Sequence, residues 1–183
     1  ALSVSSGAII VFLLVITQAQ VQVWKNSLTL FGHALSINPD NYVAHVNLGV
    51  ALKAEGRLEE AIQHFQASLK NKPGFHYAHY NLGVALDAAG EKMEAYNHYQ
   101  AAVKLNPKNA NAYFNMAHAL KEQGKMEEAA DYFRRAIKIN PDFAEAHNNL
   151  GIILEMYFKN YDEAIYHYRQ ALSYDDGNSG VHY

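Results

Sequence analysis

Apolar side chains recur at helical spacing through most of this chain. In the first such stretch His45, Leu48 and Leu52 are separated by three or four residues, which places them on one face of an α-helix. Gly56 ends this stretch, because glycine is a common residue at the end of a helix. A second stretch with the same spacing follows at residues 58–69. The pattern predicts two amphipathic helices joined by a short turn.

The two-helix pattern repeats with a fixed period. Four prolines are present, each 34 residues after the last, at Pro39, Pro73, Pro107 and Pro141. Each closes a unit, since proline cannot continue a helix. The segment HVNLGVALKAEGRLEEAIQHFQASLKNKP is followed by HYNLGVALDAAGEKMEAYNHYQAAVKLNP and YFNMAHALKEQGKMEEAADYFRRAIKINP. A fourth copy, HNNLGIILEMYFKNYDEAIYHYRQALSYDD, contains one extra residue. One helix pair cannot bury both of its faces, so neighbouring units must stack.

This period and this pattern resemble the tetratricopeptide repeat. The resemblance implies an all-α fold, a right-handed superhelical solenoid of four repeats with a half repeat in front. The expected divisions are an apolar helix at 1–22, a half repeat at 23–41 and a tetratricopeptide domain at 42–183. Within that domain we expect repeats at 42–75, 76–109, 110–143 and 144–178, with a further repeat starting at 179–183. The fourth repeat should be the least regular, because its turn glycine is missing near Phe158.

Two kinds of residue recur where neighbouring helices must meet. Small residues stand at one position of the first helices, namely Gly49, Gly83, Ala117 and Gly151. Rings stand at one position of the second helices, namely Phe65, Tyr99, Phe133 and Tyr168. A larger side chain at the small position would force the helices apart, at a cost of about 1–3 kcal/mol. We expect the rings to fill the space between units.

Residues 1–16, ALSVSSGAIIVFLLVI, contain no charged side chain. This run is shorter than the roughly 20 residues that span a bilayer, although the chain begins without Met and a span could extend further to the left. Three interpretations are open: a transmembrane helix that lacks its first turns, the core of a signal peptide, and a helix that caps the repeats. The uniform apolarity favours the first, which predicts membrane association through residues 1–19.

The junction between this run and the repeats carries a second resemblance. An apolar end followed by QVQVWKNSLTLFGHALSINPDNYVAHVNLG is similar to the transmembrane-and-tetratricopeptide O-mannosyltransferases and their bacterial relatives. In those families a membrane glycosyltransferase core precedes a tail of repeats in the lumen or periplasm. The resemblance implies a membrane-anchored chain whose repeats are extracytoplasmic and whose catalytic carboxylates would lie upstream of Ala1. Lys25 is the only basic residue before Lys53, which also disfavours a cytoplasmic flank.

Composition narrows the classes of function. The chain has 15 basic and 18 acidic residues and a net charge of −3. It therefore has no positive field that would attract nucleic acid. It has no Cys, which excludes disulfides and thiolate metal sites. No phosphate-binding loop or nucleophile elbow occurs, so we expect no enzymatic activity and no cofactor. Histidine recurs at two repeat positions, which favours packing over metal binding; these residues are His45, His79 and His147, and His64, His98 and His167.

Asparagine recurs at one position of every first helix, at Asn47, Asn81, Asn115 and Asn149. First helices line the concave groove in this family, and the four positions resemble the asparagine ladder of the O-linked N-acetylglucosamine transferase repeats, which grips an extended peptide backbone. An amide suits this role because it offers donors and an acceptor. The alternative is that these side chains only support contacts between helices. Nearby aromatic and apolar residues are expected to receive side chains of the ligand; they are Tyr77, Tyr80, Val84 and Phe114.

The sequence therefore favours a protein–protein interaction scaffold that binds an extended peptide segment in the groove. Two alternatives are open. The chain could be the regulatory or substrate-presenting tail of a membrane glycosyltransferase whose catalytic part lies upstream, or a self-assembly module in which exposed repeat ends stack on other copies. The expected partners are a protein or peptide and, through residues 1–19, a membrane.

Overall fold

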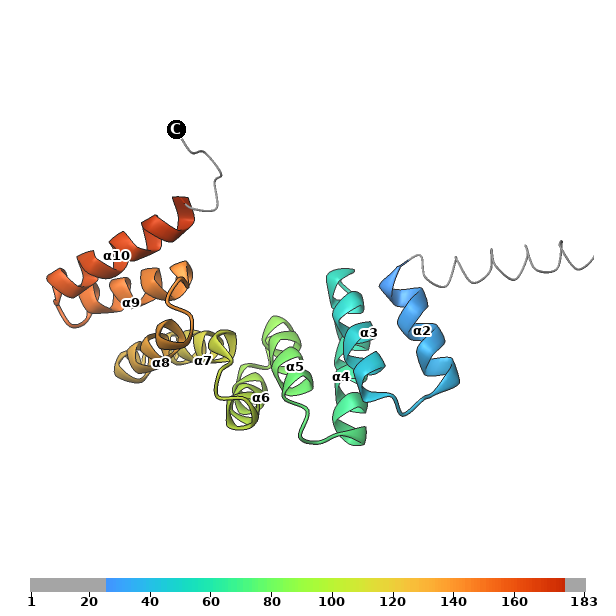
Figure 1. Cartoon of the computed structure of the whole chain (residues 1–183). Coiled ribbons are helices and arrows are strands. Elements are labelled where there is room, and N and C mark those ends of the chain that lie inside the picture. Colours follow the sequence, from blue (N-terminus) through green and yellow to red (C-terminus); the bar gives the residue numbers. More distant parts are fainter. Residues whose placement is uncertain (1–25, 177–183) are drawn as a thin grey trace, which may run out of the picture. The chain divides into compact units, whose positions relative to one another are not determined.

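The computed structural model describes residues 26–176, which form nine α-helices and no strand. The half repeat expected at 23–41 contains α2 (Ser27–Ile37). The helices that follow are α3 (Tyr42–Ala54), α4 (Leu58–Asn71), α5 (His76–Ala88), α6 (Lys92–Leu105), α7 (Ala110–Glu122), α8 (Met126–Ile139), α9 (Ala144–Met156) and α10 (Tyr161–Asp176). Eight helices were expected after Tyr42, and α3 to α10 confirm that expectation (Figure 1).

Two segments singled out by the sequence lie outside the described residues. These are the apolar helix expected at 1–22, with its membrane contact through residues 1–19, and the start of a further repeat at 179–183. Within residues 26–176 no helix is both long enough and apolar enough to cross a membrane.

The chain divides into two compact units, with the boundary inside α5 between Asn81 and Leu82. In the first unit α3 packs against both α2 and α4. In the second unit each of α6 to α9 packs against the helix that follows it in the chain. Figure 1 shows α9 and α10 lying side by side as an antiparallel hairpin. Each unit is therefore built from stacked helix hairpins.

Three turns between paired helices use glycine in a left-handed conformation. Gly56, Gly90 and Gly124 have φ angles of 77°, 88° and 76°, a region that only glycine enters without strain. The fourth turn has Lys159 with φ 55°. The missing glycine thus leaves a non-glycine residue in the left-handed region.

The residue that precedes the first helix of a repeat alternates along the chain between asparagine and phenylalanine. Asn41 caps α3 by accepting from the backbone N–H of Ala44 at 3.1 Å, and Asn109 caps α7 in the same way. Asparagine is among the best residues for this position. At the equivalent position before α9, Phe143 makes no capping hydrogen bond. Its ring instead stacks on Phe114 of the preceding repeat, with 4.9 Å between ring centroids.

Rings from the second helices fill the interior of each hairpin. Phe65 and Phe133 are fully buried. A Cβ added to Gly49 would lie 2.6 Å from Phe65, and one added to Gly151 would lie 2.7 Å from Tyr168. The rings were expected to fill the space between units; the structure places Phe65, Tyr99 and Tyr168 each against the glycine of its own repeat, and Phe133 joins a core that also includes residues of α9. The glycine is needed because the ring occupies the volume in which a side chain would stand.

Candidate peptide-binding site

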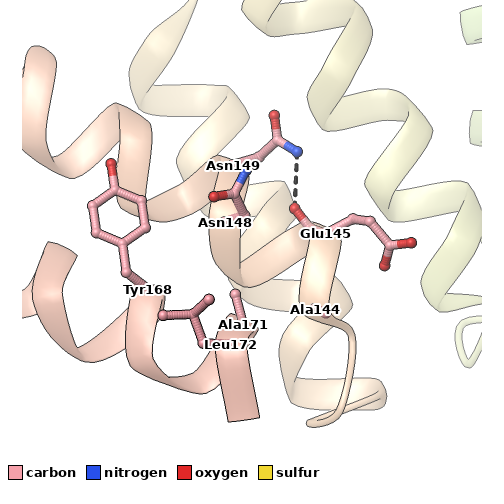
Figure 2. A pocket seen from close by; sticks show the side chains of 7 residues that line it. All are labelled: Ala144, Glu145, Asn148, Asn149, Tyr168, Ala171 and Leu172. Atoms are coloured by element: carbon pink, nitrogen blue, oxygen red, sulfur yellow. Dashed lines mark hydrogen bonds between the residues drawn. The ribbon is translucent and has the colours of Figure 1, made fainter. Parts of the chain in front are cut away.

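The second unit contains a pocket of about 510 Å³ between α9 and α10 (Figure 2). Its polar lining comes from Glu145, Asn148 and Asn149 on α9. Its apolar lining comes from Ala144 on α9 and from Tyr168, Ala171 and Leu172 on α10. Asn149 is a member of the predicted asparagine ladder. The pocket therefore offers amide groups beside an apolar wall, a combination suited to a peptide segment.

Two hydrogen bonds hold the Asn149 amide in place. Its Nδ2 donates to the backbone oxygen of Glu145 at 2.8 Å, within the same helix (Figure 2). Its Oδ1 accepts from Nζ of Lys121 on α7 at 2.6 Å. An amide has two N–H donors and two acceptor lone pairs, so one N–H and one lone pair remain for a ligand. The orientation of this side chain is thus fixed before any ligand arrives.

Tyr168 forms a rigid wall of the same pocket. Its ring packs against Gly151, and its hydroxyl donates to Oε2 of Glu155 at 2.7 Å. Burial and the neighbouring Glu155 carboxylate raise the pKa of Tyr168 to about 12. The phenol therefore keeps its proton at neutral pH, and with it the hydrogen bond that positions the ring.

The first unit contains a smaller pocket of about 240 Å³, lined by Val43, Val46, Asn47, Phe75 and Tyr77. Tyr77 is 57% exposed and Val43 is 44% exposed, so both can contact a ligand. Asn47 supplies the amide here. This pocket joins one asparagine of the ladder to one of the aromatic residues expected beside it.

The two pockets use the same repeat positions. Val43, Val46 and Asn47 in the first repeat correspond to Glu145, Asn148 and Asn149 in the fourth. Asparagine is present at the third position in both. The first two positions are apolar in the first unit and polar in the second, so the two pockets favour different chemistry in the ligand.

The remaining candidate residues have varied surroundings. Asn81 donates from Nδ2 to the backbone oxygen of Tyr77 at 2.8 Å, the same bond to its own helix that Asn149 makes. Asn115, Tyr80 and Val84 are half-buried. Phe114 is also half-buried and contacts Phe133 as well as Phe143. Much of the Phe114 ring surface is therefore used in packing between α7 and its neighbours.

Sequence reasoning missed the role of Lys121. Lys121 was not among the predicted binding residues, yet its ammonium group donates a hydrogen bond to the ladder residue Asn149 two helices later in the chain. The available signal was a basic side chain in the last turn of α7. Which neighbouring helix it would reach depends on how α7 and α9 pack, and spacing alone does not provide that.

No group of three or more metal-ligating side chains occurs within residues 26–176. The two pockets accordingly contain amide, hydroxyl, carboxylate and apolar groups. Their chemistry suits binding through hydrogen bonds and apolar contact.

The described chain is thus an all-α protein made of stacked helix hairpins. It carries tetratricopeptide repeats. Models described as "Tetratricopeptide repeat" match residues 24–80, 110–143 and 132–166, and one described as "TPR repeat" matches residues 88–124. No curated protein sequence matches the chain.

Solved structures with the same fold include MamA and PilF. A crystal structure of MamA is 21% identical, with a TM-score of 0.74 over 98% of this chain and 100% of that chain. MamA from Desulfovibrio magneticus RS-1, residues 41 to the end, is 20% identical, with a TM-score of 0.70 over 82% of this chain and 84% of that chain. PilF from Pseudomonas aeruginosa is 19% identical, with a TM-score of 0.75 over 86% of this chain and 72% of that chain. At these identities the likeness shows the fold alone.

Proposed function

We propose that this chain is a protein-interaction scaffold without enzymatic activity, and that its first helices bind extended peptide segments. One observation carries the proposal. The same three repeat positions line a pocket in each unit, and both pockets include an asparagine of the ladder. Tetratricopeptide repeats generally bind protein partners, and this general property supports the assignment.

Amide groups suit the backbone of such a ligand. The ladder residues Asn47, Asn81, Asn115 and Asn149 can donate to and accept from a peptide unit without reading its side chain. Asn81 and Asn149 are oriented by bonds to their own helices. A pre-oriented amide loses little side-chain entropy on binding, which favours affinity.

Apolar contacts would differ between the two pockets. In the first unit Tyr77 and Val43 would receive an apolar side chain, with Tyr80 on the same helix as Tyr77. In the second unit Leu172 and the Tyr168 ring would contact an apolar group while Asn148 and Asn149 bond the backbone. Val84 and Phe114 complete the proposed set with the surface that their packing leaves accessible.

A display library of random linear peptides tests this proposal. Peptides enriched on the whole chain should bind Tyr77→Ala or Asn149→Ala more weakly. The Tyr77 change should cost about 2 kcal/mol or more, as an aromatic contact at the centre of an interface does. The Asn149 change should cost about 1–3 kcal/mol, because a buried peptide group loses its partner.

The control substitutions Tyr161→Ala and Asn97→Ala remove the same kinds of side chain elsewhere in the protein. Tyr161 is 55% exposed on α10, close to the exposure of Tyr77, and Asn97 is exposed on α6. Neither lines a pocket described above. Peptides that bind all four variants as tightly as the unchanged protein would show that the ligand surface lies elsewhere.

A different proposal rests on the apolar residues 1–22 and their junction with the half repeat. It makes the chain the membrane-anchored, extracytoplasmic tail of a glycosyltransferase, with a regulatory or substrate-presenting role. The support is the resemblance of the junction in sequence. The full reading frame tests it: hydrophobic spans with acidic loop residues before Ala1 are expected, and a frame without them would reject it.

Self-association is a further proposal, supported by exposed apolar side chains on α10. Ile165 and Leu172 are 48% and 63% exposed. Their counterparts in α8, Ala130 and Ile137, pack into the core of the second unit. Light scattering across a range of concentrations distinguishes a self-associating chain from a monomer. A mass that stays at the monomer value would reject self-association.

A further inference from the structure

Histidine side chains hydrogen-bond one another across the helix hairpins of the first and fourth repeats. In the first repeat Nδ1 of His45 on α3 lies 3.0 Å from Nδ1 of His64 on α4. In the fourth repeat Nδ1 of His147 on α9 lies 2.8 Å from Nδ1 of His167 on α10. His147 and His167 are 3% and 8% exposed. Each pair is therefore a direct polar link between the two helices of a hairpin.

The tautomers follow from a second hydrogen bond in each pair. Nε2 of His45 lies 2.8 Å from the backbone oxygen of Pro39, and Nε2 of His147 lies 3.0 Å from that of Pro141. A carbonyl oxygen only accepts, so Nε2 of His45 and His147 must carry the proton. A neutral imidazole has one N–H, which leaves Nδ1 of these two rings as an acceptor. His64 and His167 must then donate from Nδ1.

This arrangement tolerates one added proton and resists the second. A proton on Nε2 of His64 leaves its Nδ1–H donating to His45, so the link remains. A second proton would fall on Nδ1 of His45, and two N–H groups would face each other at hydrogen-bond distance. The same holds for His147 and His167. In an unfolded chain both rings take up protons independently.

The surroundings of the first pair lower the pKa of His64 overall. Burial is the main cause that lowers the pKa of His64, and His45 lowers it further; Glu60 raises it. Glu60 is itself bonded by Arg57 through two contacts of 2.7 Å, which offsets its charge.

The surroundings of the second pair are similar. Burial again comes first in lowering the pKa of His167, and His147 and Arg134 add to it, while Glu163 raises it. Oε1 of Glu163 lies 3.9 Å from Nε2 of His167 and 3.3 Å from the Arg134 guanidinium. Because the folded-state pKa values of His64 and His167 are lowered, the unfolded chain binds more protons below about pH 6.5. Stability from the pairs is present above that pH and is lost as the pH falls.

The third repeat has no histidine at these two positions. Tyr113 and Tyr132 occupy them, with stacked rings and 6.1 Å between centroids. A phenol keeps its proton over the range in which imidazole titrates. The hairpin of α7 and α8 therefore provides an internal reference within the second unit.

We propose that the histidine pairs of the first and fourth repeats are latches that acid releases. Above the range in which imidazole titrates, they hold α3 against α4 and α9 against α10. On acidification these hairpins loosen while that of α7 and α8 keeps its contact. Because the larger pocket lies between α9 and α10, its walls separate when the fourth-repeat latch opens. The latch itself does not depend on any ligand.

Nitrogen NMR of the histidine rings in the unchanged full chain tests the latch directly. At about pH 7.5, where imidazole is mostly neutral, His45 and His147 should show the Nε2–H tautomer, and His64 and His167 the Nδ1–H tautomer. As the pH falls, the second proton of each pair should bind at lower pH than the first, and below the ordinary imidazole range. Tautomers of the opposite kind, or a second proton bound within the ordinary imidazole range, would overturn the proposal even if no variant folded.

Hydrogen exchange and one double substitution test the consequence. At about pH 5, below the imidazole range, protection should fall in α9 and α10 before α7 and α8. Equal loss in both hairpins would count against the latch. The variant H147Y/H167Y copies the tyrosine pair of the third repeat. Between about pH 7.5 and pH 5 the Tm of the unchanged protein should fall further than the Tm of this variant, by at least about 2 °C. The control variant H33Y should show the same fall in Tm as the unchanged protein.

Discussion

At the scale of single residues, the interior of a hairpin depends on one glycine and one ring. Glycine in the middle of a helix costs about 0.5–1 kcal/mol relative to alanine, so its presence at Gly49, Gly83 and Gly151 needs a cause. The cause is distance: an added Cβ would lie 2.6–2.7 Å from the ring across the hairpin at all three positions. Close packing, and not backbone conformation, requires glycine there.

The substitution Gly151→Ala tests this packing argument. The new methyl group would displace the Tyr168 ring, which Glu155 also holds. We expect a loss of about 1–3 kcal/mol in the free energy of unfolding, as overpacked cores show. Urea titration measures it. The control is Gly32→Ala on α2, where no atom lies within 4 Å, and a gain of about 0.5–1 kcal/mol is expected from helix propensity. Equal stability of both variants would mean that the ring moves aside freely.

At the scale of helices and turns, the last hairpin departs from the other three. Its extra residue and the absence of glycine leave Lys159 at φ 55°. Asn160 follows and forms a reciprocal cap with Glu163: the amide donates to the carboxylate at 2.7 Å, and the Glu163 N–H donates to the amide oxygen at 3.4 Å. The cap fixes the start of α10 although the turn before it is strained.

Lys159→Gly should therefore stabilise the chain. Left-handed backbone costs a non-glycine residue about 1–2 kcal/mol, and the greater freedom of glycine in the unfolded state offsets part of this gain. We expect a net gain of about 0.5–1 kcal/mol, measured as a rise in Tm. Gly124→Ala, at φ 76°, is the opposite change and should lower Tm. A Lys159→Gly variant that melts earlier would show that the Lys159 side chain stabilises the turn.

The sequence predicts these elements better than their contacts. Proline spacing and turn glycines define α3 to α10, because both residues act on the local backbone. The histidine pairs were visible only as residues recurring at two repeat positions. That His45 would meet His64 depends on the distance between paired helices, as does the bond from Lys121 to Asn149. Periodicity indicates which face a residue occupies, and packing decides which atom it touches.

At the scale of the whole molecule, burial is local along the chain. The core of the second unit is made by rings and aliphatic side chains of consecutive helices, α7 to α10. Phe65 in the first unit and Phe133 in the second stand at the same repeat position, and both are fully buried. In repeat proteins, stability is close to a sum of repeat and nearest-neighbour terms. Damage to one repeat should therefore weaken its neighbours first.

Phe65→Ala and Phe133→Ala form a matched pair that tests this locality. Each removes a fully buried ring and should cost about 3–5 kcal/mol where it occurs. Hydrogen exchange near neutral pH should show loss of protection in α3 and α4 for Phe65→Ala, with α9 and α10 much less affected. Phe133→Ala should show loss in α7, α8 and the start of α9, with α3 and α4 keeping their protection. The two patterns are expected to be reciprocal, because each variant is the control for the other. If instead both variants lose protection evenly over residues 26–176, the chain unfolds as one cooperative body, and nearest-neighbour stacking does not describe its stability.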